Sequence, residues 1–332
     1  MKIIVILCLV LLVSCSQEPE VVTGPFVFKN GITYDQTTNE PITGIVEKFY
    51  KNGQLDRRQH YKNGRRDGLD ESFRENGQLA VSRNYKDGKE DGLWEVFDVN
   101  GQLDSRQHFK NGKRDGLDES FRENGQLKEK VTYKDGERHG LWEEFYENGQ
   151  LAGSGNEKDG KEDGLLVYYQ ENGLVFDSRN YKDGKLHGLY EEFYENGQLI
   201  SRQHFKNGEP DGLDETFHEN GQLKTKRTYK DGVLQGLWEW FYENGQLEHK
   251  SNFKDGKLEG LSEWYLENGQ LYFSDNYKDG KENGLYEEFD ENGQLAIRGN
   301  KKDGELHGLF EYFDEEGNLT ETVTYENGVE VK

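Results

Sequence analysis

Short segments with regularly spaced apolar residues alternate with polar turns along almost the whole chain, and no segment has the 3.6-residue apolar period of a helix. A Leu is followed four residues later by an aromatic residue, as in Leu141 and Phe145, and this pair recurs with a 24-residue period. A second pair, six residues apart, follows the same period, as in Leu127 and Tyr133. Both spacings are even, so each pair lies on one face of a strand. The pattern predicts two strands of roughly seven to nine residues per unit.

Two series of glycine dipeptides separate these strands. The first series opens the tetrapeptide NGQL at Asn52, Asn76, Asn100, Asn124, Asn148, Asn196, Asn220, Asn244, Asn268 and Asn292. The second series follows eleven residues later, as at Asp87-Gly88 and Asp159-Gly160. Such dipeptides are strong hairpin signals because their residues tolerate positive φ. We therefore expect an all-β fold: an elongated antiparallel β-meander of about twelve two-stranded 24-residue repeats, twisted or curled as large open sheets are.

Two geometries are open for the NGQL turn. A two-residue turn pairs Glu147 with Gln150 and sets Leu141 and Phe145 on the face opposite Leu127 and Tyr133. It also places Glu and Arg residues across from each other in three repeats, namely Glu47 and Arg58, Glu95 and Arg106, and Glu191 and Arg202.

A three-residue turn with a bulge pairs Tyr146 with Gln150 instead, and then all of these Leu and aromatic positions share one face. We favour this second geometry. Burial contributes roughly 1.5–3 kcal/mol per apolar side chain, whereas an exposed cross-strand ion pair contributes about 0.2–1 kcal/mol.

The favoured geometry leaves a set of aromatic residues on the other, charged face. These residues occupy positions at which the copies differ most, and they are Trp94, Trp142, Trp238, Trp240, Trp264, Tyr146, Tyr194 and Tyr242. Lateral packing within the sheet is one explanation for them. Contact with a partner is the other, because variable aromatic residues on a charged face are typical of binding surfaces.

Composition and charge narrow the function. Only 32% of residues are hydrophobic but 13% are aromatic, which suits many short strands over thin cores. The formal charge of −23 disfavours nucleic acid as a partner. No catalytic or phosphate-binding motif is present, so we expect no enzymatic activity and no cofactor. Two periodic His series, His60, His108 and His204 and then His139, His187 and His307, fit turn-flanking polar residues better than metal ligands.

The first fifteen residues, MKIIVILCLVLLVSC, have one positive charge followed by an apolar run, as in a secretory signal. Their end, Leu12-Val13-Ser14-Cys15, resembles the lipobox of bacterial lipoproteins, which implies cleavage before Cys15 and lipidation of its thiol. An ordinary signal peptide with a chance cysteine is the alternative. We expect residues 1–14 to be the signal peptide, 15–25 a tether, 26–43 an N-terminal cap and 44–332 the repeat array.

The repeated phrase GLWEEFYENGQL, followed by YKDGK, resembles the MORN-repeat variant family of bacterial envelope and secreted proteins. Many members of that family are labelled antitoxins of toxin–antitoxin pairs. The resemblance implies a repeat scaffold, and a lipoprotein signal fits a cytoplasmic antitoxin poorly.

We therefore expect a protein of the bacterial cell envelope, lipid-anchored in the outer membrane if the host has one. Its expected function is that of a non-enzymatic scaffold for an unknown protein or glycan, with the lipid as its only membrane contact. An antitoxin or immunity protein, or a structural spacer of the envelope, is the alternative.

Overall fold

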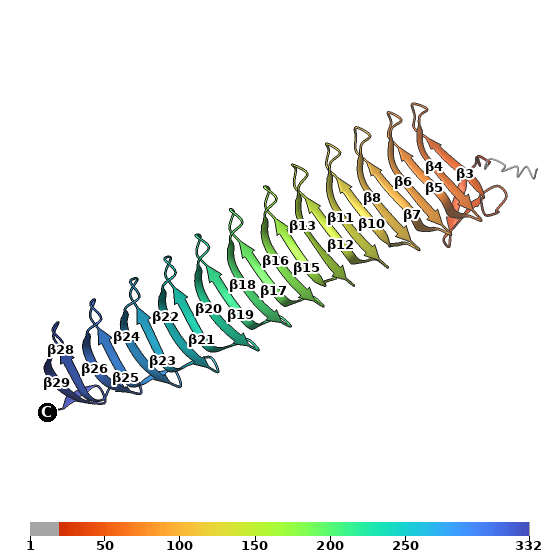
Figure 1. The fold of residues 1–332 in the computed structure, drawn as a ribbon. Coiled ribbons are helices and arrows are strands. Elements are labelled where there is room, and N and C mark those ends of the chain that lie inside the picture. Colours follow the sequence, from red (N-terminus) through yellow and green to blue (C-terminus); the bar gives the residue numbers. More distant parts are fainter. Residues whose placement is uncertain (1–19, 332) are drawn as a thin grey trace, which may run out of the picture. The chain divides into compact units, whose positions relative to one another are not determined.

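The structure is a computed structural model that describes residues 20–331 (Figure 1). These residues form β-strands and turns and contain no helix. The large sheet has 28 strands, and strands consecutive in sequence pair antiparallel. The predicted all-β antiparallel meander is therefore confirmed.

The described chain falls into two compact units, with the strand β11 (Leu127–Lys134) divided between them. The N-terminal unit extends to Gln126 and includes Tyr133–Gly136. Its strands are β1 (Phe26–Lys29), β2 (Ile32–Asp35), β3 (Gly44–Phe49), β4 (Leu55–Lys62), β5 (Arg65–Phe73), β6 (Leu79–Lys86), β7 (Lys89–Phe97), β8 (Leu103–Lys110), β9 (Lys113–Arg114) and β10 (Gly116–Phe121).

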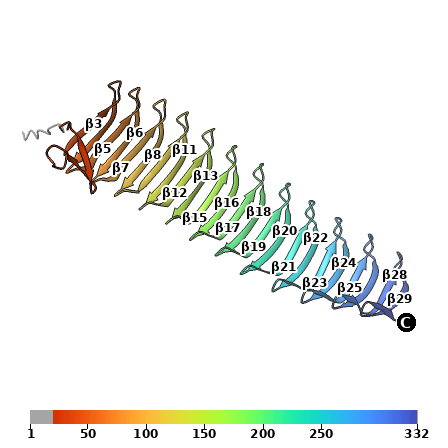
Figure 2. The same ribbon diagram turned by 180° about the vertical axis from the view of Figure 1, so that it is seen from behind.

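The C-terminal unit contains Leu127–Thr132 and the residues from Glu137 onward. Seen from behind in Figure 2, its hairpins again follow one another in chain order. Its strands are β12 (Glu137–Phe145), β13 (Leu151–Lys158), β14 (Lys161–Glu162), β15 (Gly164–Tyr169), β16 (Val175–Lys182), β17 (Lys185–Phe193), β18 (Leu199–Lys206), β19 (Glu209–Phe217), β20 (Leu223–Lys230), β21 (Val233–Phe241), β22 (Leu247–Lys254), β23 (Lys257–Tyr265), β24 (Leu271–Lys278), β25 (Lys281–Phe289), β26 (Leu295–Lys302), β27 (Glu305–Leu306), β28 (Gly308–Phe313), β29 (Leu319–Glu326) and β30 (Val329–Val331).

The second series of dipeptides forms two-residue hairpin turns, as predicted. Lys86 pairs with Lys89, and the intervening Asp87 and Gly88 have φ of 50° and 87°. Two consecutive positive φ values define the type I′ turn, which matches the twist of the strands that it joins. Each turn also bonds to the preceding unit, since the Gly88 N–H donates to the Arg66 carbonyl at 2.8 Å.

The NGQL turns have the favoured three-residue geometry. The Tyr146 N–H donates to the Gln150 carbonyl at 2.8 Å, and the Gly149 N–H donates to the Tyr146 carbonyl at 3.0 Å. Gly149 has a φ of 84°, and the Asn148 side chain accepts the Gln150 N–H at 2.9 Å. The prediction for this turn is confirmed.

The predicted assignment of faces is wrong, because a second irregularity follows each three-residue turn. Phe145 lies opposite Leu151, but Glu144 lies opposite Gly153, so Ala152 is an extra residue. The bulge returns the rest of the hairpin to the register that a two-residue turn would give. Leu141 therefore lies on the charged face and is 46% exposed.

In that register Glu and basic residues alternate along one face of the sheet. Glu47 lies opposite Arg58, and the Arg58 guanidinium reaches Glu47 at 2.8 Å and Glu71 at 3.8 Å. The same arrangement joins Arg106 to Glu95 and Glu119. The Glu and Arg correspondence seen in the sequence is thus a structural feature, and the tryptophans pack on the opposite face.

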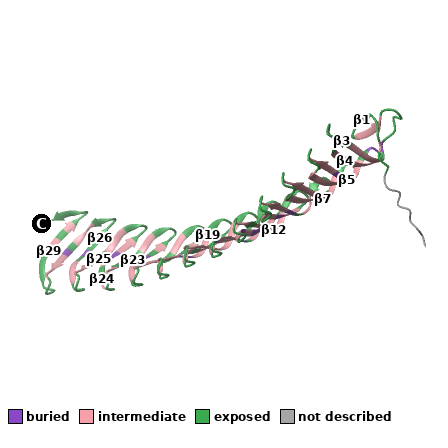
Figure 3. Cartoon of the chain, turned by 90° about the horizontal axis from the view of Figure 1, so that it is seen from above, coloured by how far each residue is buried: buried purple, intermediate pink, exposed green. Residues whose placement is uncertain are grey.

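A wide bulge at each Gly-Leu pair completes the unit. Arg83 pairs with Trp94 but Tyr85 pairs with Glu90. Between these two pairs β7 therefore has more residues than β6. The Asn84 side chain donates to the Leu93 carbonyl at 3.0 Å and satisfies a backbone group that the bulge leaves free. Figure 3 shows the result, in which intermediate exposure predominates along the strands and buried stretches are short.

The segment predicted as an N-terminal cap contains a separate two-stranded sheet, β1–β2. Part of the predicted tether also packs against the array, because the Ile45 N–H donates to the Glu20 carbonyl at 2.9 Å and the Val22 N–H donates to the Ile45 carbonyl at 2.8 Å. These bonds cover the outer edge of β3, which would otherwise expose unpaired backbone groups. The predicted signal peptide and Cys15 lie outside the described residues.

Strand β13 carries two glycines, Gly153 and Gly155, in its interior. Strand β13 pairs with both β12 and β15. A Cβ at Gly155 would lie 2.9 Å from Trp142 Nε1 and 2.4 Å from Leu166 Cδ1. The Trp142 and Leu166 side chains therefore occupy the space that a side chain at position 155 would need.

Candidate binding surface

Five rings of the C-terminal unit stack in one row, which we call the aromatic ladder: Trp238, Trp240, His249, Trp264 and Phe273. Its centre is His249 in β22. The imidazole lies 4.4 Å from the Trp240 ring and 3.6 Å from the Trp264 ring, with interplanar angles of 19° and 10°. Trp238 stacks on Trp240 at 3.9 Å, and Phe273 stacks on Trp264 at 5.5 Å.

The cross-strand register builds this row. Trp240 pairs with His249, His249 with Trp264, and Trp264 with Phe273, across four consecutive strands. Neighbouring strands are about 4.8 Å apart, close to the spacing of stacked rings. Aromatic residues in successive paired positions therefore form a continuous stack on one face of the sheet.

The edges of the ladder remain open although the ring faces are covered. Trp264 is 36% exposed even though it stacks on His249 and on Phe273. At one end of the row, the Arg227 guanidinium lies 5.1 Å from the Trp238 ring. Apart from the buried His249, the rings of the ladder are thus partly exposed, and a cation flanks the row.

His249 is buried and neutral within the row. Its Nε2 lies 2.6 Å from Ser251 Oγ and 3.0 Å from Ser262 Oγ, and both hydroxyls are buried. Burial lowers the pKa of His249 to about 4, because the charged imidazolium loses its hydration there.

The other two predicted tryptophans lie elsewhere. Trp94, in the N-terminal unit, packs against Phe109 at 5.1 Å and under the Arg83 guanidinium at 4.3 Å. Trp142 packs near Tyr168 at 6.1 Å in the C-terminal unit. Of the five candidates, only Trp238, Trp240 and Trp264 are brought together.

The three predicted tyrosines serve the turns. The hydroxyls of Tyr146 and Tyr242 donate to backbone carbonyls of the following unit, Tyr169 O at 2.6 Å and Tyr265 O at 2.8 Å. Tyr194 does the same to Phe217 O at 3.3 Å. Their hydroxyls link consecutive hairpins, and the tyrosines are not part of the ladder.

Sequence reasoning missed His249 and Phe273. His249 belongs to neither periodic His series, and the favoured face assignment did not pair it with a tryptophan. The two-residue register would have placed it opposite Trp240, so the signal was present in the alternative that was set aside.

The periodic histidines contact strand carbonyls or the turn of the following unit. His60, His108 and His204 place Nδ1 within 2.7, 2.5 and 3.3 Å of the carbonyls of Leu69, Leu117 and Leu213. His187 Nδ1 accepts the Asn207 N–H at 3.4 Å. Across residues 20–331, no group of three or more His, Cys, Asp or Glu side chains is placed to hold a metal ion. Over the same residues, no helix has the length and apolarity needed to cross a membrane.

The hairpins, their two turn types and the 24-residue period define a β-hairpin repeat protein. The family is the MORN repeat variant, whose model matches the chain in ten segments, and the chain belongs to this family. The matched residues are 42–63, 90–111, 114–135, 138–156, 186–207, 210–231, 234–255, 258–279, 282–302 and 306–327.

No curated protein matches the chain. Among solved structures, it is similar to a chain of the TcdB2-TccC3-Cdc42 structure (10% identity, TM-score 0.18), covering 85% of this chain and 18% of that one. It is also similar to choline binding protein F from Streptococcus pneumoniae (16% identity, TM-score 0.20), covering 90% and 99%. TM-scores this low carry no argument about function.

Proposed function

We propose that the protein is a non-enzymatic repeat scaffold and that the aromatic ladder is its contact with a protein partner. One observation carries this proposal: partly exposed stacked rings occupy positions that most other repeats fill with small or charged residues. The repeat position of Trp240 and Trp264 holds Ser72, Ser120 and Glu192 in other repeats, and an aromatic residue again only as Tyr168 and Tyr312. The fold therefore does not require tryptophan there, which favours binding over lateral packing as the reason for the ring row.

A protein partner suits the ladder better than a glycan. Sugars stack on free aromatic faces, but the faces of Trp240, His249 and Trp264 are covered by one another. Ring edges and a flanking guanidinium fit the mixed apolar and polar surface of a protein. Binding of a glycan is an outcome that the experiment below distinguishes.

The proposal includes attachment to the bacterial envelope through lipid on Cys15. Acyl chains contribute roughly 0.8 kcal/mol per buried CH₂, and two or three chains give firm anchoring. In Cys15→Ala, palmitate labelling should be lost and the protein should move to the soluble fraction, with its circular dichroism unchanged. Retained labelling would return the segment to an ordinary signal peptide.

Co-isolation from solubilised envelopes tests the ladder. The double variant Trp240→Ser/Trp264→Ser introduces a residue that other repeats hold at the same repeat position, so the hairpins should persist. It should lose a protein that the wild type retains, whereas Trp94→Ser, on the N-terminal unit, should keep it. A preparation that retains only carbohydrate would favour the glycan, and no difference between the variants would support a spacer instead.

A further inference from the structure

A cleft of about 570 Å³ lies in the N-terminal unit between the β1–β2 hairpin and the first strands of the large sheet. Four aromatic side chains and two arginines line it with three glycines and a threonine: Phe26, Phe28, Tyr61, Tyr85, Arg65, Arg66, Gly31, Gly64, Gly88 and Thr33. The volume falls in the range of small-molecule sites.

The cleft exists because the β1–β2 hairpin docks on the Asn63-Gly64 turn between β4 and β5. The Thr33 N–H donates to the Gly64 carbonyl at 2.8 Å, and the Gly64 N–H donates to the Ile42 carbonyl at 2.7 Å. A Cβ at Gly64 would lie 2.3 Å from the Ile32 side chain, so only glycine permits this approach. Ile42 is buried beneath the contact.

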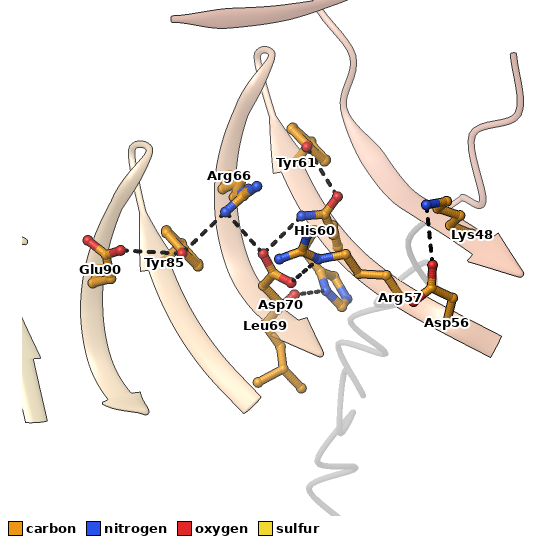
Figure 4. A network of polar contacts seen from close by, with 11 residues as sticks. Lys48, Asp56, Arg57, His60, Tyr61, Arg66, Leu69, Asp70, Tyr85 and Glu90 are labelled. Atoms are coloured by element: carbon orange, nitrogen blue, oxygen red, sulfur yellow. Dashed lines mark hydrogen bonds and ion pairs between the residues drawn. The ribbon is translucent and has the colours of Figure 1, made fainter. Parts of the chain in front are cut away.

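The cationic groups of the cleft differ in how they are held. Figure 4 shows Arg66 between Asp70 and Tyr85: its Nη1 lies 3.3 Å from the Asp70 carboxylate and 3.2 Å from the Tyr85 hydroxyl. The Arg65 guanidinium has no hydrogen bond or ion pair within residues 20–331, and the Arg65 backbone pairs across the strands with Lys62. Cationic pairs also close equivalent turns, such as Lys86 with Lys89 and Lys110 with Lys113, so what distinguishes Arg65 is its place in the lining of the cleft.

The charged side chains that line the cleft are all cationic. The lining contains two guanidinium groups and no carboxylate. Phe28, on the hairpin, is 71% exposed beside these cations. An unpartnered arginine, an exposed phenylalanine and tyrosine rings together match a ligand that is planar, apolar and anionic.

We infer that this cleft binds a small ligand with a planar aromatic body and one anionic group. Arg65 meets the anion, Phe28 and Tyr61 cover the ring, and Arg66 is already engaged with Asp70 and Tyr85. The site is independent of the aromatic ladder, which lies in the other unit, so failure of either proposal leaves the other standing.

The test uses two fluorescent probes that share a body. Anilinonaphthalene sulfonate carries a charge, and phenylnaphthylamine is neutral. With the full chain, the sulfonate should bind at one site, and Arg65→Gln should weaken it about tenfold while changing the neutral probe little. Phe28→Ser should weaken both probes.

The matched control is Lys113→Gln, at the equivalent turn position two repeats later, where no hairpin docks and Arg114 stacks on Tyr133 as Arg66 does on Tyr85. It should leave the binding of both probes unchanged. Equal loss of sulfonate binding in Arg65→Gln and Lys113→Gln, or no loss in either, would overturn the assignment.

Discussion

At the scale of single residues, the repeat position of Asp70 accepts very different side chains, because the neighbouring residues change with it. Asp70 is buried and accepts a hydrogen bond from Arg57 at 3.1 Å. Trp94, one repeat later, instead lies under the Arg83 guanidinium. Arginine serves both cases, since it pairs with a carboxylate or stacks on a ring. This exchange explains why the position varies while the period stays fixed.

His249 makes stability depend on pH. Its folded-state pKa is about 4, below the value near 6.5 of an unfolded chain, so the unfolded state binds the proton between these values. Its contribution is therefore fully present above about pH 6.5 and is lost on acidification, by about 3 kcal/mol at pH 4. In His249→Thr, which copies Thr225 of the preceding repeat, this part of the loss should vanish.

Urea unfolding of the wild type and of His249→Thr at pH 7 and pH 4.5 measures how much of the acid-induced loss of stability is due to His249. The carboxylates that titrate in the same range are common to both proteins. Identical pH dependence of the two free energies of unfolding would contradict a neutral, buried imidazole.

Gly116 occupies a bulge that a side chain would disrupt. Its φ is 127°, and a Cβ would lie 2.9 Å from the His108 Cβ. Gly116→Ala should therefore lower the free energy of unfolding by more than the ~1 kcal/mol of backbone strain alone. Gly260→Ala is the control, because Gly260 has a φ of 85° but open space around its Cβ position. Equal urea midpoints for the two variants would show that the contact with His108 has no effect.

At the scale of the hairpin, the sequence predicted the turns well and the faces poorly. Asn-Gly and Asp-Gly dipeptides determine local backbone geometry, so both turn types follow from a few residues. The extra residue Ala152 has no such signature, because a bulge needs only one additional position opposite Glu144. Burial and ion pairing do not compete for one register along the whole hairpin, because the bulge allows the turn and the body of the strands to have different registers. Three of the five residues of the ladder were therefore predicted, namely Trp238, Trp240 and Trp264, and His249 and Phe273 were missed.

Consecutive hairpins are joined by hydroxyl bonds such as that of Tyr146 to the Tyr169 carbonyl. Tyr146→Phe should cost about 1 kcal/mol, since it removes one hydrogen bond and leaves the carbonyl unsatisfied. Tyr272→Phe should cost little, because the Tyr272 hydroxyl has no hydrogen bond in the described part of the chain. Thermal unfolding followed by circular dichroism compares them, and a larger shift for Tyr272→Phe would argue against this link.

At the scale of the molecule, charge is unevenly distributed along the chain. Nearly all of the formal charge of −23 lies in residues 137–332, which also contain the aromatic ladder. A partner that approaches this part of the chain meets a negative field, so complementary basic groups on the partner would speed association and make it sensitive to salt. The aromatic cleft with its two arginines lies instead in the nearly neutral N-terminal part.

Site-specific photo-cross-linking tests the central claim most directly, namely that the aromatic ladder is the face that meets a partner. Benzoylphenylalanine replaces Phe273 on the ladder or, in a second protein, Leu261 on the opposite face of the neighbouring strand. In envelopes, the account predicts one adduct of defined mass from position 273, absent in the Trp240→Ser/Trp264→Ser background, and no such adduct from position 261. The same adduct from position 261, or its persistence without the two tryptophans, would contradict the account.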